Sequence, residues 1–153
     1  MYGRYHHGVE RENCPSVNGA SNWAAVDPRH MGLGPVHASV PMLTEQKLTV
    51  DDIAYWELNE AFAAQVLACL AAWKDDAYCQ TQLGMDKAFG EISHEQLNVD
   101  GGAIGIGHPV GASGTRIVHH LLKILQRNKS KLGVATICIG GGQGGAMLVE
   151  NLQ

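Results

Sequence analysis

The alternation of apolar and polar residues predicts helices and strands from about residue 35 to about residue 150. A short helix is expected over Pro35–Glu45, where Pro35 suits the first turn and Pro41 favours a kink or an early end. The segment Ile53–Asn59 alternates as a strand does. It leads directly into the segment Glu60–Lys74, in which alanine and leucine dominate and therefore favour a helix.

Two of the predicted helices differ in how their apolar residues are distributed. Within Ala61–Trp73 apolar residues occur on nearly every face, which predicts a helix that is buried on all sides. Within Ala112–Asn128 they form one stripe, which predicts an amphipathic helix packed on a sheet. The stripe consists of Ile117, Val118, Leu121, Leu122 and Leu125.

The C-terminal part predicts a β-hairpin, because the apolar strands Gly133–Ile139 and Ala146–Glu150 are joined by a glycine-rich turn. The order of elements predicts an α/β fold with layers of helices and a sheet, in one domain over residues 23–153. Residues 1–22 show neither helical nor strand periodicity and are expected to form an irregular N-terminal arm. The polar stretch Asp75–Leu97 is expected to be a surface excursion with some helix.

Charge and cysteine content narrow the classes of function. Lysine and arginine total 11 and aspartate and glutamate total 15, so the net charge of −4 gives no basic surface for nucleic acid or membrane. The four cysteines form no C-x-x-C pair, and no targeting segment is recognised, so we expect reduced thiols and a cytoplasmic protein. No metal site is expected, because the adjacent pairs His6–His7 and His119–His120 point apart on a helix or strand.

Glycine is concentrated around two side chains that could transfer protons, His108 and Cys138. Twelve of the 19 glycines lie between Gly101 and Gly145, where backbone must turn sharply or approach a ligand. His108 precedes a predicted helix, which suits a hydrogen-bond donor to an oxyanion or a base toward a thiol, or else a structural histidine in a tight turn. Cys138 ends a predicted strand, where clefts form in layered α/β folds, although a buried cysteine is usually a small apolar residue.

The remaining candidates are weaker. Asn59 ends a strand before a helix, so it either caps the helix or directs its amide into the same cleft. Cys69 is expected in the core, and Cys14 and Cys79 are expected to be incidental surface thiols. The segment GIGHPVG departs from the G-x-G-x-x-G pattern of dinucleotide folds and has no strand before it, so a nucleotide site is disfavoured.

Three motifs, in this order and spacing, resemble the C-terminal half of a thiolase, an acetyl-CoA acyltransferase. They are NEAFAAQ from Asn59, GGAIGIGHPVGASG from Gly101 and CIGGGQGGAMLVE from Cys138; MGLGPVHA, from Met31, also resembles the family. The resemblance covers about residues 23–152 and implies a thiolase-like half-fold with a mixed sheet and a buried central helix. It also implies acyl transfer to or from CoA in fatty-acid metabolism, with a CoA thioester as substrate and no other cofactor.

The resemblance also implies roles for individual residues. His108 matches the histidine that activates the nucleophilic cysteine and, with a water held by the residue matching Asn59, helps to bind the thioester oxygen. Cys138 matches the second cysteine, which takes the α-proton of the acyl acceptor and protonates the departing CoA thiolate. The N–H of Gly140 matches a donor of the second oxyanion hole. The positions that match the lining of the pantetheine tunnel are Met31, Ala61 and Phe62.

The sequence departs from the family because it contains no C-x-S-G-like loop for the acyl-accepting cysteine, and the surroundings of Cys14 do not match. The stretch between Asn59 and His108 is also longer than in compact members of the family. Three hypotheses follow: a catalytic half that works with an N-terminal half, an idle truncated fragment that binds only CoA or a partner half, or an interaction module. Thiolase-like halves pack their central helices together, so the helix Ala61–Trp73 of an isolated half would expose an apolar patch. We therefore expect self-association, as a homo-oligomer, or assembly with an N-terminal half.

Overall fold

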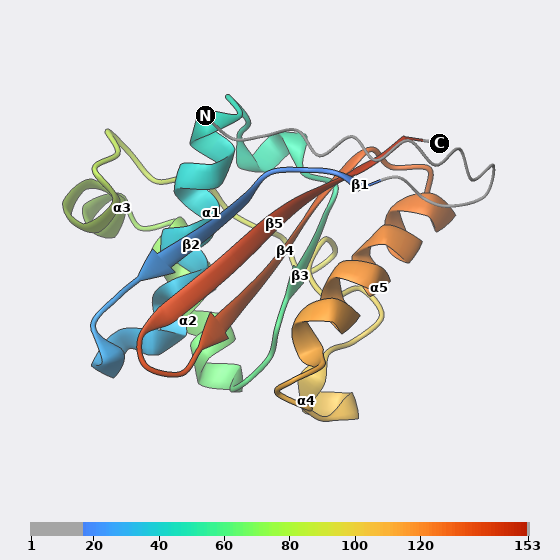
Figure 1. Cartoon of the computed structure of the whole chain (residues 1–153). Helices are drawn as coiled ribbons and strands as arrows, with labels where there is room; N and C mark the ends of the chain where they lie inside the picture. Colours follow the sequence, from blue (N-terminus) through green and yellow to red (C-terminus); the bar gives the residue numbers. More distant parts are fainter. Residues whose placement is uncertain (1–16, 153) are drawn as a thin grey trace.

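The computed structural model describes residues 17–152, and these form one mixed sheet with helices on both faces (Figure 1). The strands are β1 (Val17–Asn18), β2 (Ser21–Ala25), β3 (Tyr55–Leu58), β4 (Leu132–Ile139) and β5 (Gln143–Asn151). The α-helices are α1 (Gly34–Glu45), α2 (Ala63–Trp73), α3 (Asp76–Leu83), α4 (Ala103–Ile106) and α5 (Ser113–Arg127). Two short 3-10 helices are η1 (Pro28–Leu33) and η2 (Val50–Asp52). The α/β class predicted from the sequence is confirmed.

The sheet order is β1-β5-β4-β3, and β2 also pairs with β5. Strands β3 and β4 are parallel, whereas β5 runs antiparallel to β4 and to both N-terminal strands. The helices α2 to α5 all belong to the connection between β3 and β4. Since parallel strands end at the same edge, the residues that follow β3 lie beside the end of β4. This edge of the sheet, called the β3/β4 edge below, carries the candidate chemistry.

A tight glycine turn joins β4 to β5 and confirms the predicted hairpin. Gly141 and Gly142 have φ angles of 84° and 86°, a region that favours glycine. The carbonyl of Gly142 accepts a hydrogen bond of 2.8 Å from the Val26 N–H, so the segment after β2 closes over the turn. The turn and the start of η1 are therefore held together at the β3/β4 edge.

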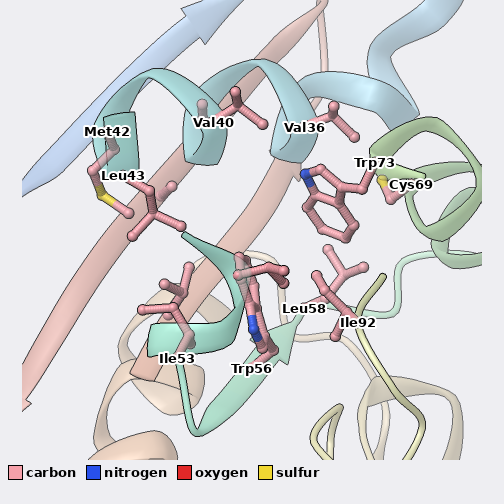
Figure 2. Close-up of a cluster of buried hydrophobic side chains, with 14 of the residues drawn as sticks. Val36, Val40, Met42, Leu43, Ile53, Trp56, Leu58, Cys69, Trp73 and Ile92 are labelled. Carbon is pink, nitrogen blue, oxygen red and sulfur yellow. The ribbon is translucent and has the colours of Figure 1, made fainter. Parts of the chain in front are cut away.

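On one face of the sheet, α1 and α2 enclose the larger hydrophobic cluster (Figure 2). The rings of Trp56 and Trp73 lie 5.4 Å apart, and the indole N–H of Trp73 donates to Ser39 Oγ at 3.3 Å. Helix α1 reaches β5 at Gly34 and Gly144, where a side chain on either glycine would collide with the backbone of the other segment. Pro41 lies inside α1 without ending it, so the expected early end is wrong.

On the opposite face, α5 covers β3, β4 and β5 with the predicted stripe. Ile117, Leu121, Leu122 and Leu125 are buried against Ala135 and Val149. Val118 is only partly buried, and Ile124, outside the predicted stripe, is buried as well. The periodic pattern thus identifies both the helix and the face that it buries.

Two expectations about the N-terminal part and the thiols are corrected by the structure. Ser21 and Asn22 belong to β2 and pair with Met147 and Ala146 of β5, and residues 17 and 18 form β1, so they are not part of an irregular arm. Residues 1–16, including Cys14, lie outside the described part of the chain. Cys79 is fully buried, with its thiol donating to the Ala72 carbonyl at 3.4 Å, and so is not a surface thiol. Cys69 is fully buried, as expected.

Helix α2 is buried on one face only, so the prediction of burial on all sides is wrong for these residues. Its inner face carries Cys69, Ala72 and Trp73. Its outer face is apolar and exposed, with Phe62 at 62% and Leu67 at 60% of their full exposure. The α2 outer face consists of Phe62, Ala63, Ala64, Leu67, Ala68 and Ala71. The all-round apolar pattern fits a helix with a second packing partner, and no described element covers this face.

None of the helices in the described residues is both long and apolar enough to cross a membrane.

Candidate functional site

The β3/β4 edge brings together the three residues that the sequence selects for chemistry. Asn59 follows β3 directly, and its backbone N–H donates to the Thr136 carbonyl of β4 at 3.0 Å. Cys138 lies two residues farther along β4, one position before the strand ends. His108 arrives at the same edge from the loop between α4 and α5, where it contacts Asn59. The lower end of the sheet in Figure 1 shows how β3, β4, α4 and α5 converge there.

Asn59 presents its side chain to His108 and does not cap α2. Its Nδ2 lies 3.4 Å from His108 Nε2, and the residue is 1% exposed. The capping alternative is wrong, because α2 begins at Ala63 with Phe62 in the capping position. Asn59 Oδ1 is buried and has no hydrogen-bond partner among the described residues. A buried orphan acceptor is costly, so this oxygen is suited to accept from a bound molecule or water.

The hydrogen bonds around His108 assign its tautomer. Its Nδ1 lies 2.7 Å from Ser113 Oγ, and that hydroxyl donates its single proton to the Pro109 carbonyl at 3.2 Å. With its proton on that carbonyl, Ser113 Oγ accepts from Nδ1–H, and Nε2 is then the unprotonated nitrogen that faces Asn59. Such an imidazole can take a proton at Nε2 while Nδ1 stays fixed. A histidine with a purely structural role in a turn would not require an unprotonated Nε2.

Ser113 is a functional candidate that the sequence reasoning missed. It is fully buried in the first turn of α5, and its hydroxyl orients the imidazole of His108. The available signal was its spacing, since a serine five residues after a histidine and at a helix start can fold back onto the ring. Such partners of a base fix the tautomer and the ring orientation.

Cys138 lies at the same β3/β4 edge, with its side chain on the α1 face of the sheet. It pairs with Gly144 of β5, which contacts α1. Because side chains alternate along a strand, Cys138 points to the same face as Val134, four residues earlier, which belongs to the cluster under α1. The thiol is 5% exposed, and this burial raises its pKa above the ordinary value. Among the described residues no hydrogen bond joins Cys138 to His108. Both residues lie at the β3/β4 edge, and the expected meeting of the imidazole and the sulfur across one pocket stays a prediction.

The other predicted site residues surround the same edge. Gly140 is exposed in the turn after β4, and Ala61 and Phe62 form the connection from Asn59 to α2. Met31 is half-buried in η1, which packs against α2. One such contact is the hydrogen bond of 3.1 Å from the Cys69 thiol to the Gly32 carbonyl. That these residues line a substrate tunnel stays a prediction.

A pocket of about 400 Å³ lies on the α5 side of this edge. The end of β3, the segment 98–106 and α5 form its walls, and Asn59 lies in the wall nearest to His108. His108 and Cys138 do not line it. The walls are mixed, with apolar Leu58 and Ile117 beside charged side chains of α5. The pocket therefore adjoins the proposed chemistry without containing it.

A chain of ionisable groups that the sequence reasoning missed lies along this pocket. His120 Nδ1 lies 3.1 Å from Glu57 Oε1, and its Nε2 lies 3.2 Å from Asp100 Oδ2. Arg127 donates two hydrogen bonds, of 2.9 and 3.0 Å, to Asp100, and this lowers the pKa of that carboxyl group. Glu57 is 3% exposed, and burial raises its pKa to about 7 although His120 acts in the opposite direction. The strand period could have placed Glu57 on the same side of the chain as Asn59.

Comparison with known proteins identifies the family. Residues 16–151 match the family described as "Thiolase, C-terminal domain". The acetyl-CoA acetyltransferase of Syntrophomonas wolfei is 47% identical over 129 residues, which are 83% of this chain and 28% of that protein. The 3-ketoacyl-CoA thiolase of Aliivibrio salmonicida is 44% identical over 124 residues, 81% of this chain and 28% of that protein.

Solved structures give the same result. The human mitochondrial 3-ketoacyl-CoA thiolase superposes with a TM-score of 0.72 at 36% identity, over 88% of this chain and 30% of the human chain. The same human protein, in complex with CoA, matches equally well. The described chain thus spans less than a third of the relatives that it matches. With a family match over most of its length and the three motifs at one edge of the sheet, the chain belongs to the thiolase family, to whose C-terminal domain it corresponds.

Proposed function

We propose that this chain provides the acid–base residues of a thiolase-type acyl transfer to or from CoA, either thiolytic cleavage or Claisen condensation of a 3-ketoacyl-CoA. The observation that carries the proposal is the fixed imidazole of His108, whose Nδ1 is held by Ser113 and whose Nε2 faces the buried amide of Asn59. A base, a polar amide and a thiol at one sheet edge fit the movement of protons around a thioester carbonyl.

In the first half-reaction, His108 Nε2 takes the proton from the thiol of an acyl-accepting cysteine. The thiolate then attacks the carbonyl carbon of the substrate, and the carbon–carbon or carbon–sulfur bond to the leaving group breaks. Among the described thiols, Cys69 and Cys79 are fully buried in the core and Cys138 serves the second proton transfer, so we place this nucleophile outside the described residues. It is supplied by another part of a longer protein or by a partner half.

Cys138 handles the second proton. In condensation its thiol protonates the departing CoA thiolate, and the Cys138 thiolate so formed removes a proton from the α-carbon of the acyl acceptor. In thiolysis its thiol protonates the departing enolate, and the thiolate so formed takes the proton of the incoming CoA thiol. Burial raises the pKa of Cys138, so the sulfur holds its proton at neutral pH and is suited to the acid role. The N–H of Gly140 in the exposed turn stabilises the oxyanion, and Met31, Ala61 and Phe62 line the path of the pantetheine chain.

A chimera tests the proposal. The part of the Syntrophomonas wolfei relative that precedes the matched region is fused to this chain, and thiolysis of acetoacetyl-CoA is measured. We expect activity that falls by about 10²–10⁴-fold in His108→Ala and in Cys138→Ala, because each removes a proton-transfer group. Lys87→Ala, at an exposed position of the 75–97 stretch, serves as the matched control and keeps full activity.

Two outcomes would contradict the catalytic assignment. A chimera that folds and binds CoA, but whose activity is the same with and without His108 and Cys138, would remove these residues from the chemistry. A chimera that binds CoA and has no activity would favour the alternative of an idle thiolase fragment that only binds CoA or a partner half.

A further inference from the structure

The loop that delivers His108 runs beside β3 as an additional, irregular strand. The Trp56 N–H donates to the Gln96 carbonyl at 2.8 Å, and the Asn98 N–H donates to the Trp56 carbonyl at 2.9 Å. Trp56 and Leu97 form an isolated parallel bridge. The path of the loop therefore follows the last residues of β3 toward Asn59.

Asn98 continues this pairing with its side chain. Its φ of 46° turns the backbone away from the sheet, in a region that asparagine tolerates better than most residues. Its Oδ1 accepts from the Leu58 N–H at 2.9 Å, and its Nδ2 donates to the Leu58 carbonyl at 2.9 Å. The same Nδ2 also donates to Glu60 Oε1 at 2.8 Å, so the amide joins β3 to the residue after Asn59.

Glu60 also binds the loop at a second position, Ile104. Its Oε2 accepts from the Ile104 N–H at 3.0 Å, near the start of α4. Gly102 packs directly on the carboxylate, and a side chain at that position would collide with it. One carboxylate thus binds the loop at Asn98 and at Ile104, and its two hydrogen bonds to N–H groups are of the charge-assisted kind.

The short helix α4, which contains Ile104, connects the Glu60 contact to His108. The Gly107 N–H donates to the Ala103 carbonyl at 2.8 Å and ends α4, and His108 is the next residue. From the other side, Arg116 of α5 donates to the Gly107 carbonyl at 2.8 Å. The carboxylate of Glu60, the residue next to Asn59, thus acts together with Arg116 and Ser113 on the position of the imidazole relative to Asn59.

We infer that Glu60 is a positioning residue of the site: its carboxylate clasps the 98–107 loop and so helps to fix the distance and angle between His108 Nε2 and Asn59 Nδ2. The inference rests on the proposed function for its catalytic consequence, and on the contacts above for its geometry. Glu60 touches neither His108 nor Asn59 through its carboxylate, so its effect on the site passes through the loop.

The test uses the full 153-residue chain and two measurements that need no activity. Amide exchange of Ile104 reports the clasp, and the side-chain nitrogen spectrum of His108 reports the imidazole. In Glu60→Ala we expect exchange at Ile104 to be at least about tenfold faster and the His108 signals to shift or split into two forms. Glu60→Gln keeps one acceptor oxygen for the two donors, so intermediate values are expected.

Glu91→Ala is the matched control, because Glu91 is an exposed carboxylate that forms an ion pair with Lys74, the residue after α2, and belongs to a segment away from the 98–107 loop. It should leave both measurements at the wild-type values. Unchanged Ile104 exchange and unchanged His108 signals in both Glu60 variants would overturn the inference. If Glu60→Ala does not fold, the near-isosteric Glu60→Gln decides, and His108 signals identical to wild type in that variant would overturn it equally.

The chimera separates this inference from the proposed function. If the chimera is active, Glu60→Ala should lower kcat by about tenfold or more with little change in KM, because misplacing a catalytic group by a fraction of an ångström costs rate rather than binding. An unchanged kcat in an active chimera would overturn the inference. If His108 proves dispensable for activity, the proposed function fails, while the exchange and spectral measurements still decide whether Glu60 positions the imidazole.

Discussion

Helices α2 and α5 lie on opposite faces of the same sheet, and their outer surfaces are opposite in character (Figure 1). The exposed side of α5 carries Thr115, His119, Lys123 and Arg127, which water solvates well. The α2 outer face consists of alanines with Phe62 and Leu67, which remain exposed to water in the described chain. One helix completes its side of the fold, and the other is suited to a further layer of protein.

The inner surfaces of the two helices do not show this difference. Trp73 of α2 and Leu121 of α5 are both fully buried in their clusters. Large side chains on both faces therefore stabilise the sheet. Only the outer surfaces of the two helices differ, because one is polar and the other is apolar. This separates the residues that fold the described domain from the residues that leave an apolar surface exposed on α2.

The largest expected effect concerns the inner faces. Trp73→Ala removes a buried ring beside Trp56 and the hydrogen bond to Ser39, and should lower the free energy of unfolding by about 3–5 kcal/mol. Leu121→Ala, on the α5 side, should cost about 2–5 kcal/mol. Urea denaturation followed by circular dichroism measures both. A loss below about 1 kcal/mol in Trp73→Ala would show that the α2 side is not a true core.

The second effect is a dependence of stability on pH that arises from Glu57, on the α5 face of the sheet. Burial raises the pKa of Glu57 from 4.5 to about 7, so between these values the folded state holds a proton that the unfolded state has lost. This group's contribution to stability is therefore greatest below pH 4.5, decreases as the pH rises to about 7, and is constant above that, a change on the order of 3 kcal/mol. The groups that face Glu57 are His120, Asp100 and Glu60.

Glu57→Gln should remove most of this pH dependence, because a carboxamide does not ionise and can still accept from His120. Urea midpoints measured from pH 4 to pH 8 report the change, with Glu91→Gln as a surface control. Parallel pH profiles for the wild type and Glu57→Gln would contradict the assignment of a buried, neutral carboxyl group on the α5 side.

The smallest effect on stability concerns the outer faces. Leu67→Gln places a polar group on the exposed side of α2 and should change the free energy of unfolding by less than about 0.5 kcal/mol. It should nevertheless reduce the self-association that an exposed apolar face promotes. Light scattering coupled to size-exclusion chromatography measures this, and His119→Gln on the outer face of α5 should change nothing. A wild-type chain that is monomeric at all concentrations would contradict the comparison.

The sequence predicts the parts of the fold that depend on local patterns. The stripe of α5 and the hairpin β4–β5 are specified by residues close together in the chain, so their local patterns are sufficient. The burial of α2 is not predictable in this way, because it depends on a layer that these residues do not provide. The motifs likewise locate Asn59, His108 and Cys138 at one edge, since the parallel pairing of β3 with β4 follows from the layered fold.

The supporting contacts of the site were not predictable, because they join residues far apart in the chain. Glu57 and His120 are separated by 63 positions, and Glu60 reaches Asn98 across 38 and Ile104 across 44. No local period relates such pairs, and each residue alone has an ordinary alternative as a solvated charge. The face of the sheet on which Cys138 lies was also not specified until the register of β4 with β5 was known.

The most direct test of the account is the tautomer of His108, because the proposed base requires an unprotonated Nε2. Nitrogen-15 NMR of the full chain at a pH where the imidazole is neutral distinguishes the protonated from the bare ring nitrogen. The account predicts a proton on Nδ1 in the wild type and a mixture of tautomers in Ser113→Ala. A proton found on Nε2 of the wild-type imidazole would contradict it.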